Sequence, residues 1–193
     1  SAVIVDGTVG LAGHTIELAK EFDRVKKKAA IIGLDSDIEM LTEALYNIKK
    51  VKTNCEIYLK KANYADTYLV LKTRDLSKAD GLLLDLGVNT AQLNDKNRGF
   101  SFDGENLDMR FDKSKDITAS RIVNDFRENN LVEIFRKYGE VSQARLLAEK
   151  IINNRPINSA RQLKIICEKV VGWKNKKIHP ATTVFQALRI AVN

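Results

Sequence analysis

Short apolar runs alternate with segments of helical periodicity from the start of the chain to about residue 87. The first run begins at Ala2, and the others lie at residues 29–35, 55–59 and 80–87. Between them, the spacing predicts helices over 16–22, over 38–48 and, capped by Asn63 or Asp66, to about residue 73. The last run is nearly continuous, which is typical of a strand buried on both faces. The alternation predicts an α/β fold with a doubly wound sheet, whose ligand lies across the carboxyl ends of the strands.

Three glycines, Gly7, Gly10 and Gly13, follow the first apolar run directly. Glycine suits such a turn because it adopts positive φ angles and lets a ligand approach the main chain closely. The turn indicates a site for a nucleotide-like cofactor. The same pattern also joins strands to helices in proteins without a ligand, so the turn alone leaves both interpretations open.

The second apolar run ends in a carboxylate, Asp35. It follows Gly13 at close to the spacing of about 20 residues between a glycine loop and a ribose-binding acid. A carboxylate at the end of a strand can accept hydrogen bonds from both ribose hydroxyls. The alternative is a solvated aspartate that caps the helix beginning near Asp37.

The composition fits an enzyme-sized soluble chain. Its 193 residues are 44% hydrophobic, which allows a sizeable core, and no apolar run approaches the roughly 18 residues that span a bilayer. Cys55 and Cys167 show no metal-ligand spacing, so we expect neither a structural metal nor a disulfide framework. No signal or transit peptide is visible, so we expect a cytoplasmic location. The abrupt start before the first strand leaves an organellar location open.

Lysine and arginine give the chain a formal net charge of +7. The lysines gather in clusters at 26–28, 49–50, 60–61 and 174–177. A basic surface attracts the phosphate groups of nucleic acids. Genomic base composition also produces lysine-rich chains, and the abundant asparagine and isoleucine fit that explanation. The charge alone therefore does not decide for nucleic-acid binding.

The pattern changes after Asp85. Residues 87–116 form a polar segment punctuated by glycine, and loops longer than about 15 residues usually carry function or disorder. From Thr118 onward the periodicity is helical, so we expect an α-helical block after the fourth strand. Its landmarks are capping boxes that begin at Asn130 and Ser159, a helix over 141–153, and Pro180 in the first turn of the last helix.

Six sequence blocks follow one another through almost the whole chain, among them Arg-Gly-Phe-Ser-Phe at 98–102 and Leu-Asp-Met-Arg-Phe-Asp at 107–112. The others lie at 6–14, 84–93, 138–140 and 179–193. In residues and order they resemble the MraW/RsmH family. Its members are S-adenosylmethionine-dependent methyltransferases that act on the exocyclic N4 amino group of a cytosine in small-subunit ribosomal RNA. The resemblance implies a Rossmann-like methyltransferase sheet with an inserted α-helical substrate-binding block.

The resemblance also implies a division of the chain and a cofactor pocket. Residues 1–97 would bind S-adenosyl-L-methionine, 98–178 would recognise the substrate, and 179–193 would return to the methyltransferase domain. The implied cofactor residues are Ala12, Gly13 and His14 around the methionine part, Asp35 at the ribose, Tyr64 beside the adenine, and Asp85 and Gln92, which complete the pocket. Without the resemblance, Tyr64 fits an ordinary half-buried aromatic residue equally well, and His14 fits a surface histidine.

Methyl transfer to a cytosine amino group needs an in-line arrangement and acceptors for the amino hydrogens. We expect Asn89 and Asp108 to frame the target base, with Arg110 near a phosphate or carboxylate. The alternative is an internal ion pair between Asp108 and Arg110 that pins the long loop. Arg145 is expected to bind substrate. The helical block is the expected RNA-facing element through Arg136, Lys137, Arg145, Lys150, Arg155, Arg161 and Lys164.

The implied partner is ribosomal RNA or the assembled small ribosomal subunit, with no membrane. The target base would be reached unstacked, because a duplex hides the reacting atom. The oligomeric state stays open, with a dimer as one option. Two other functions also stay open. One is a non-catalytic ribosome-assembly factor that retains the fold, and the other is a nicotinamide-dependent oxidoreductase, suggested only by the glycine turn and the acid.

Departures from the family pattern affect both sites. Ala12 replaces a usual glycine, and residues 89–91 replace a usual Ser-Ser-Pro. Ala12 is tolerable if its φ angle is negative, whereas a positive φ would weaken the case for cofactor binding. The chain also begins without the family's opening helix and ends before its last strands. We therefore expect a sheet with an exposed apolar edge.

Overall fold

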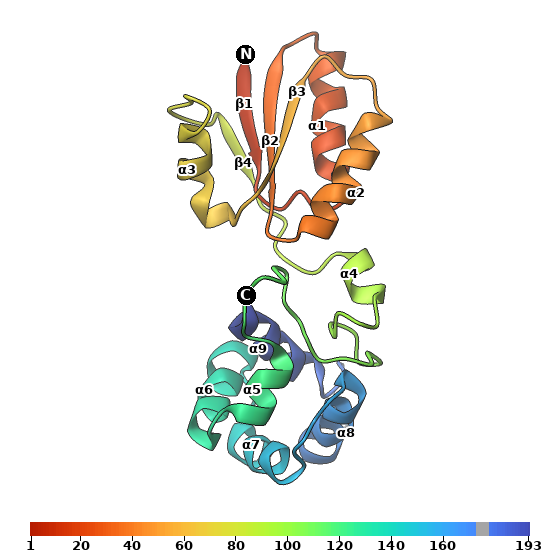
Figure 1. Ribbon diagram of the computed structural model, residues 1–193, viewed down its shortest axis with the longest axis vertical. Coiled ribbons are helices and arrows are strands. Elements are labelled where there is room, and N and C mark those ends of the chain that lie inside the picture. The colour runs from red at the N-terminus through yellow and green to blue at the C-terminus, as the bar shows by residue number, and fades with distance from the viewer. Residues whose placement is uncertain (173–177) are drawn as a thin grey trace. The chain divides into compact units, whose positions relative to one another are not determined.

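The computed structural model describes residues 1–172 and 178–193 (Figure 1). The chain forms two compact units, Ser1–Gly87 and Val88–Asn193, and each has its own hydrophobic core. The lysine cluster at 174–177 lies outside the described residues. Within the described part, no helix is long and apolar enough to cross a bilayer.

The first unit is a parallel sheet with helices on both faces (Figure 1). Its strands are β1 (Ala2–Asp6), β2 (Ala29–Asp35), β3 (Glu56–Lys61) and β4 (Gly81–Leu83), in the spatial order β3-β2-β1-β4. Its helices are α1 (Gly13–Arg24), α2 (Ile38–Lys49), the short 3-10 helix η1 (Tyr64–Asp66) and α3 (Thr67–Lys72). Every strand pair is parallel. The predicted doubly wound, Rossmann-like α/β fold is confirmed.

Successive residues of β2 face opposite sides of the sheet, as the period of two requires. Ile32 and Leu34 pack in one cluster with Leu71 of α3, whereas Ile31 packs with Ala19 of α1. Burial on both faces fixes the register of this strand, because a slip of one residue would exchange its two faces. The end of β2 is thereby held at the carboxyl edge of the sheet.

β4 is shorter and more exposed than the sequence predicts. The expectation of a strand over 80–87 buried on both faces is wrong, because only Gly81–Leu83 pair, and they pair with β1. Leu82 is 56% exposed, and Leu84 and Leu86 are also exposed. In the described part of the chain, β4 has a neighbour on one side only, so Leu82 and the two leucines that follow β4, Leu84 and Leu86, form the exposed apolar edge that was expected.

The second unit is helical, as predicted, and its largest buried side chains include Phe135, Leu147 and Leu163. In order, its helices are α4 (Thr90–Asn94), α5 (Ala119–Asp125), α6 (Glu128–Gly139), α7 (Ala144–Asn153), α8 (Ala160–Val171) and α9 (Thr182–Val192). The α4 helix lies inside the segment expected to be a loop.

The predicted helix starts have mixed outcomes. The capping box at Ser159 is confirmed, because its Oγ accepts from the N–H of Gln162 and the Gln162 side chain accepts from the N–H of Ser159. The predicted start at Asn130 is wrong. The α6 helix begins at Glu128, whose carboxylate stands in the first turn, where it interacts favourably with the helix dipole.

The two units differ from the division expected from the sequence, which placed boundaries after 97 and 178. The second unit begins at Val88, and Phe100 and Leu107 from the long loop are buried in its helical core. The last helix, α9, packs against α6 in the same core. A Cβ at Gly139 of α6 would lie 2.5 Å from the carbonyl oxygen of Thr183, so glycine permits this close approach.

Candidate functional site

The glycine turn joins β1 to α1 through residues 7–12 and is tied to both neighbouring strands. The N–H of Gly7 donates to the carbonyl oxygen of Leu83 in β4, and the N–H of Val9 donates to the carbonyl oxygen of Leu34 in β2, both at 2.9 Å. The turn therefore lies at the carboxyl edge of the sheet, as predicted.

Two of its glycines are needed for different reasons. Gly10 has a φ of +50°, in the left-handed region that glycine adopts without strain. A Cβ at Gly7 would lie 2.6 Å from Cδ2 of Leu84 and 2.9 Å from Cβ of Tyr64. The absence of a side chain at Gly7 thus brings the turn against the residues that follow β3 and β4.

A buried carboxylate holds the turn at its start. Asp6, the last residue of β1, is fully buried. Its Oδ2 accepts from the hydroxyl of Thr15 in α1 at 2.8 Å, and its Oδ1 accepts from the N–H of Thr8 at 3.2 Å. The buried acid thereby links the end of the strand to the first turn of the following helix.

Asp35 holds the turn from the neighbouring strand. Its Oδ2 accepts from the N–H of Gly10 at 2.9 Å, and its Oδ1 accepts from the N–H of Asp37 at 2.9 Å. Burial raises the pKa of Asp35 above its ordinary value, and the two hydrogen bonds only partly offset this effect. The negative charges of Asp37 and Asp6 add to the rise.

The alternative reading of Asp35 as a solvated helix cap is not what the structure shows. Asp37 is the N-cap of α2, and its Oδ1 accepts from the N–H of Glu39 at 3.0 Å. Asp35 is half-buried against the glycine turn. A ribose-binding role for Asp35 stays a prediction.

Ala12 does not meet the condition set from the sequence, because its φ is +68° and not negative. The left-handed region costs an alanine about 1–2 kcal/mol. The Ala12 side chain is fully buried in a cluster with Val9, Leu41 and Ala44, where its methyl packs against α2. The backbone at this position is therefore strained, which weakens the case for cofactor binding, but the methyl does not lie on the exposed side of the turn.

The predicted cofactor residues of the first unit gather at the carboxyl edge of the sheet. Gly13 and His14 open α1 and are exposed, and no side chain caps this helix. Tyr64 follows β3 and is 42% exposed, and Asp85 follows β4 and is exposed. Together with Asp35 they lie where doubly wound folds bind their ligands.

Gln92 and Asn89 lie in the second unit and form the capping box of α4. The side chain of Asn89 accepts from the N–H of Gln92 at 2.9 Å, and the side chain of Gln92 accepts from the N–H of Asn89 at 3.3 Å. Sequence reasoning missed this box, although an asparagine followed three residues later by glutamine has the required spacing. The described contacts of both residues are structural, and their predicted roles in the cofactor pocket and at the target base stay predictions.

Asp108 and Arg110 form the internal ion pair that was the alternative to a catalytic role. Two parallel hydrogen bonds join them, Nη2 to Oδ2 at 2.7 Å and Nε to Oδ1 at 2.8 Å. Burial opposes ionisation of Asp108, but the hydrogen bonds and charge of Arg110 outweigh it and hold the pKa of this carboxyl below its ordinary value. Arg110 also donates to the carbonyl oxygens of Lys113 and Lys115, so it pins the loop.

A cavity of about 260 Å³ lies in the second unit and includes Met109, which stands between the two ion-paired residues in the sequence. Phe102 and Phe185 of its lining meet edge to face, with ring centroids 4.8 Å apart. Aromatic faces beside polar side chains can hold a nucleobase. The lining residues are Val88, Phe100, Phe102, Met109, Thr182, Phe185, Gln186 and Arg189.

The basic residues of the helical block do not all face solvent. Arg145 is exposed on α7, where it was expected to bind substrate. Arg155 is only half-exposed, because its guanidinium donates to the carbonyl oxygens of Val123 and Phe126. Arg155 therefore fastens α5 to the segment after α7, and its expected role toward RNA stays a prediction.

Two residues that organise these sites were missed by sequence reasoning. Asp6 could have been found, because it ends the first strand as Asp35 ends the second. The role of Asn193 could not be predicted, because the residues that it contacts are distant in the sequence. Its Oδ1 accepts from the N–H of Phe111 at 2.6 Å, and its Nδ2 donates to the carbonyl of Met109 at 2.8 Å, which holds the loop against α9.

The family model and the individual relatives that match this chain point to the same family. A model of the MraW methylase family matches residues 1–193. The chain is 41% identical over 98% of its length to Ribosomal RNA small subunit methyltransferase H of Nitratiruptor sp., and it covers 60% of that protein. Proteins of the same name from Kosmotoga olearia and Thermosipho melanesiensis are 41% and 40% identical over the whole chain, which covers 65% of each. The chain thus spans 60% to 65% of the length of these relatives. On the match along its full length, the chain belongs to the MraW methylase family.

Proposed function

We propose that this chain carries the cofactor site and the target-base region of a methyltransferase. The reaction would transfer a methyl group from S-adenosyl-L-methionine to the exocyclic N4 amino group of a cytosine in small-subunit ribosomal RNA. The observation that carries the proposal is a glycine turn held by two carboxylates at the carboxyl edge of the sheet, in a chain of the MraW methylase family. The names of the relatives support ribosomal RNA as the partner.

The residues at this edge fit the parts of the cofactor. Each oxygen of Asp35 accepts one backbone hydrogen bond and keeps a second lone pair for a ribose hydroxyl. A Cβ at Gly13 would have no heavy atom within 4 Å, and His14 is exposed, so the start of α1 is open to the methionine part, whereas Ala12 is buried behind it and would shape only the path of the turn. The exposed ring of Tyr64 can cover an adenine face.

Asp85 and Gln92 complete the proposed pocket. Asp85 is exposed just beyond β4, and its N–H donates to the hydroxyl of Thr8 in the glycine turn at 2.8 Å. Its carboxylate is thereby held beside the turn. Gln92 is 5% exposed in the second unit, and its proposed role in the pocket rests on the family resemblance.

S-adenosyl-L-methionine would supply a methyl carbon activated by its sulfonium sulfur. The chain would contribute position, because in-line displacement depends on aligning the nucleophile, the carbon and the leaving sulfur. The cytosine amino group also needs acceptors for its hydrogens while positive charge develops on it. We propose that Asn89 and Asp108 frame the base, with Arg110 fixing the carboxylate of Asp108. The cavity beside Met109 is the proposed place for the aromatic ring of the base, and Arg145 is a proposed phosphate contact.

A second candidate function is a ribosome-assembly factor that retains the fold without catalysis. One observation favours it, which is the positive φ of Ala12 at a position where the family usually has glycine. Both candidates require RNA binding that weakens steeply with salt, because the chain is basic and phosphate contacts release counterions. They differ in whether a methyl group is transferred.

Calorimetric titration of the chain with S-adenosyl-L-methionine tests the cofactor site. We expect saturable binding that is lost in Asp35→Ala and kept in Asp125→Ala, which removes an exposed carboxylate in the second unit. Thermal melting of both variants checks that each is folded. Saturable binding that is unchanged in Asp35→Ala would show that the cofactor does not use this edge of the sheet.

Transfer of tritium from the labelled cofactor to small ribosomal subunits tests the reaction. The methyltransferase is expected to label a single cytosine in the RNA, and nuclease digestion identifies it. RNA that is bound but stays unlabelled would reject the methyltransferase and leave the assembly factor.

A further inference from the structure

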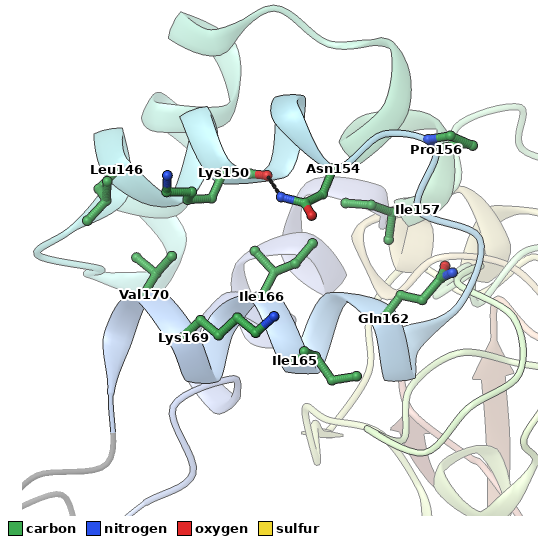
Figure 2. A pocket seen from close by; sticks show the side chains of 10 residues that line it. All are labelled: Leu146, Lys150, Asn154, Pro156, Ile157, Gln162, Ile165, Ile166, Lys169 and Val170. Carbon is green, nitrogen blue, oxygen red and sulfur yellow. Dashed lines mark hydrogen bonds between the residues drawn. The ribbon is translucent and has the colours of Figure 1, made fainter.

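A groove of about 410 Å³ runs between α7 and α8 in the second unit (Figure 2). None of its lining residues belongs to the proposed cofactor site or the proposed target-base site, although Lys150 was among the residues expected to face RNA. Figure 2 shows side chains of α7 along one side and side chains of α8 along the other. The lining residues are Leu146, Lys150, Asn154, Pro156, Ile157, Gln162, Ile165, Ile166, Lys169 and Val170.

The groove has an apolar floor and exposed apolar walls. Ile157 and Ile166 form the floor and are 1% and 8% exposed, as members of the helical core. Leu146 and Ile165 stand on opposite walls and are 43% and 45% exposed. Large aliphatic side chains gathered over a hollow are typical of a binding surface, whereas scattered ones are not.

The groove is also positively charged. Each wall contributes one lysine, Lys150 from α7 and Lys169 from α8. Among the lining residues that the structure describes, none is acidic. Lys150 lies 4.0 Å from the carboxylate of Glu149, its neighbour on α7, which is the outer limit of an ion pair. A ligand that combines aliphatic groups with carboxylates would satisfy both features of the surface.

The chemistry of the walls favours a protein segment over RNA. Sites for single-stranded RNA stack bases on aromatic or arginine side chains, and the lining residues that the structure describes include neither. The two amides are already engaged in the fold. Nδ2 of Asn154 donates to the carbonyl of Lys150, and Oε1 of Gln162 accepts from the N–H of Asn158 and of Ser159. Few polar groups are therefore left to read the edge of a base.

The dimensions suit a helix. Leu146 and Lys150 of α7 and Asn154, which caps the end of that helix, recur every four positions, so they form one row about two turns, or about 12 Å, in length. A third helix that packs into the space between two others presents aliphatic anchors at i, i+4 and i+7. We propose that this groove binds an acidic amphipathic helix of a partner protein, with aliphatic anchors over Ile165 and Ile166 and carboxylates at Lys150 and Lys169. The proposal does not depend on methyl transfer.

The probe is a synthetic amphipathic peptide of about 14 residues, with leucine at the anchor positions and glutamate on the flanks. Its affinity for the full chain is measured by fluorescence anisotropy. We expect saturable binding that weakens at least about tenfold in the charge-reversed double variant Lys150→Glu/Lys169→Glu. A twin peptide with lysine in place of glutamate should bind that variant better than it binds the parent chain.

Ile165→Asp tests the apolar wall, and Ile190→Asp is the matched control. Ile190 is 40% exposed on α9 and does not line the groove, so both variants place a charge on an exposed helix surface. We expect only Ile165→Asp to abolish peptide binding, with both variants melting as the parent does. Three results would overturn the proposal: no saturable binding of the acidic peptide, its displacement from this groove by a single-stranded RNA oligonucleotide, or a dimer of the parent chain that Ile165→Asp dissociates.

Discussion

At the scale of single residues, two glycines near the turn differ in what surrounds them. Gly13 faces open space, whereas a Cβ at Gly33 in β2 would lie 2.7 Å from Cδ2 of Leu59 and 2.9 Å from Cγ2 of Val9. Gly33 is therefore required by packing, since it lets the sheet and the turn approach each other. Gly13 carries no such packing requirement, and the proposed reason for its lack of a side chain is the approach of the cofactor from outside.

This difference predicts opposite effects of two alanine substitutions. Gly13→Ala should leave the free energy of unfolding unchanged or raise it by up to about 1 kcal/mol, because alanine is the better helix former. Its affinity for S-adenosyl-L-methionine should fall at least about tenfold, because the methyl would stand on the exposed side of the turn. Gly33→Ala should lower the free energy of unfolding by about 1–3 kcal/mol through overpacking. Urea unfolding and calorimetry measure both quantities, and unchanged cofactor affinity in Gly13→Ala would contradict the proposed contact between the start of α1 and the cofactor.

The ion pair of Asp108 and Arg110 predicts a pH dependence. Because the pKa of Asp108 is lowered by folding, the pair stabilises the chain above the ordinary carboxyl value of 3.8, and this stabilisation is lost as the pH falls through the folded value. Asp108→Asn should therefore lower the free energy of unfolding by about 1–3 kcal/mol at neutral pH, where the hydrogen bonds are to a charged group. Urea unfolding over a pH series measures the gap between variant and parent, which should narrow below 3.8. A gap that is constant with pH would show a steric cause.

At the scale of elements, the capping box of α4 explains a departure from the family pattern. Asn89 stands where the family usually has serine, and both side chains can accept the hydrogen bond that begins a helix. The shared property is the cap of α4, so the structure accounts for the exchange without reference to the reaction. The same device at Ser159 begins α8.

Two substitutions at this cap separate structure from chemistry. Asn89→Ala should lower the free energy of unfolding by about 1 kcal/mol, because the N–H of Gln92 loses its acceptor. Asn89→Ser keeps an acceptor and should restore most of that loss. If tritium transfer is also restored in Asn89→Ser, Asn89 acts as a cap. If the serine variant is stable but inactive, the amide itself contacts the base.

The elements that the sequence predicts well are those whose pattern and packing agree. The α2 helix begins at Ile38 as predicted, because its apolar stripe and its cap at Asp37 indicate the same start. β4 was less predictable, because a continuous apolar run indicates burial on two faces, and this requires a neighbour that the run itself does not specify. The backbone angle of Ala12 could not be predicted either. It follows from the path between β1 and α1, which the turn enforces at the cost of strain.

At the scale of the whole molecule, each unit buries apolar residues of its own. The core that includes Leu131 and Leu188 draws only on Val88–Asn193, and the clusters around the sheet draw only on Ser1–Gly87. The sequence predicts a loop over the segment from Arg98 to Arg110, because polar residues dominate its hydropathy pattern, and it does not predict that Phe100 and Leu107 are buried in the helical core. Its buried contacts depend on partners such as Asn193, which are distant in the sequence.

Separate cores predict that the helical unit folds by itself. A chain of residues 88–193 should show a helical circular dichroism spectrum and a single cooperative thermal transition, because its buried contacts are internal. A chain of residues 1–87 should self-associate through the exposed leucines of β4, which size-exclusion chromatography detects. A broad, non-cooperative melt of 88–193 would show that the helical unit needs the sheet for its stability.

The carboxylates of Asp6 and Asp35 have a consequence for how fast a ligand can bind. They hold the glycine turn in shape through hydrogen bonds within the chain, so that turn is already ordered before a ligand arrives. No slow rearrangement of the turn then precedes binding, and the association rate should depend on diffusion and on the displacement of water. Variants that leave the two carboxylates in place should differ chiefly in how quickly the ligand dissociates. Loss of the Asp6 carboxylate, which has no proposed contact with the cofactor, should instead slow the arrival of the ligand.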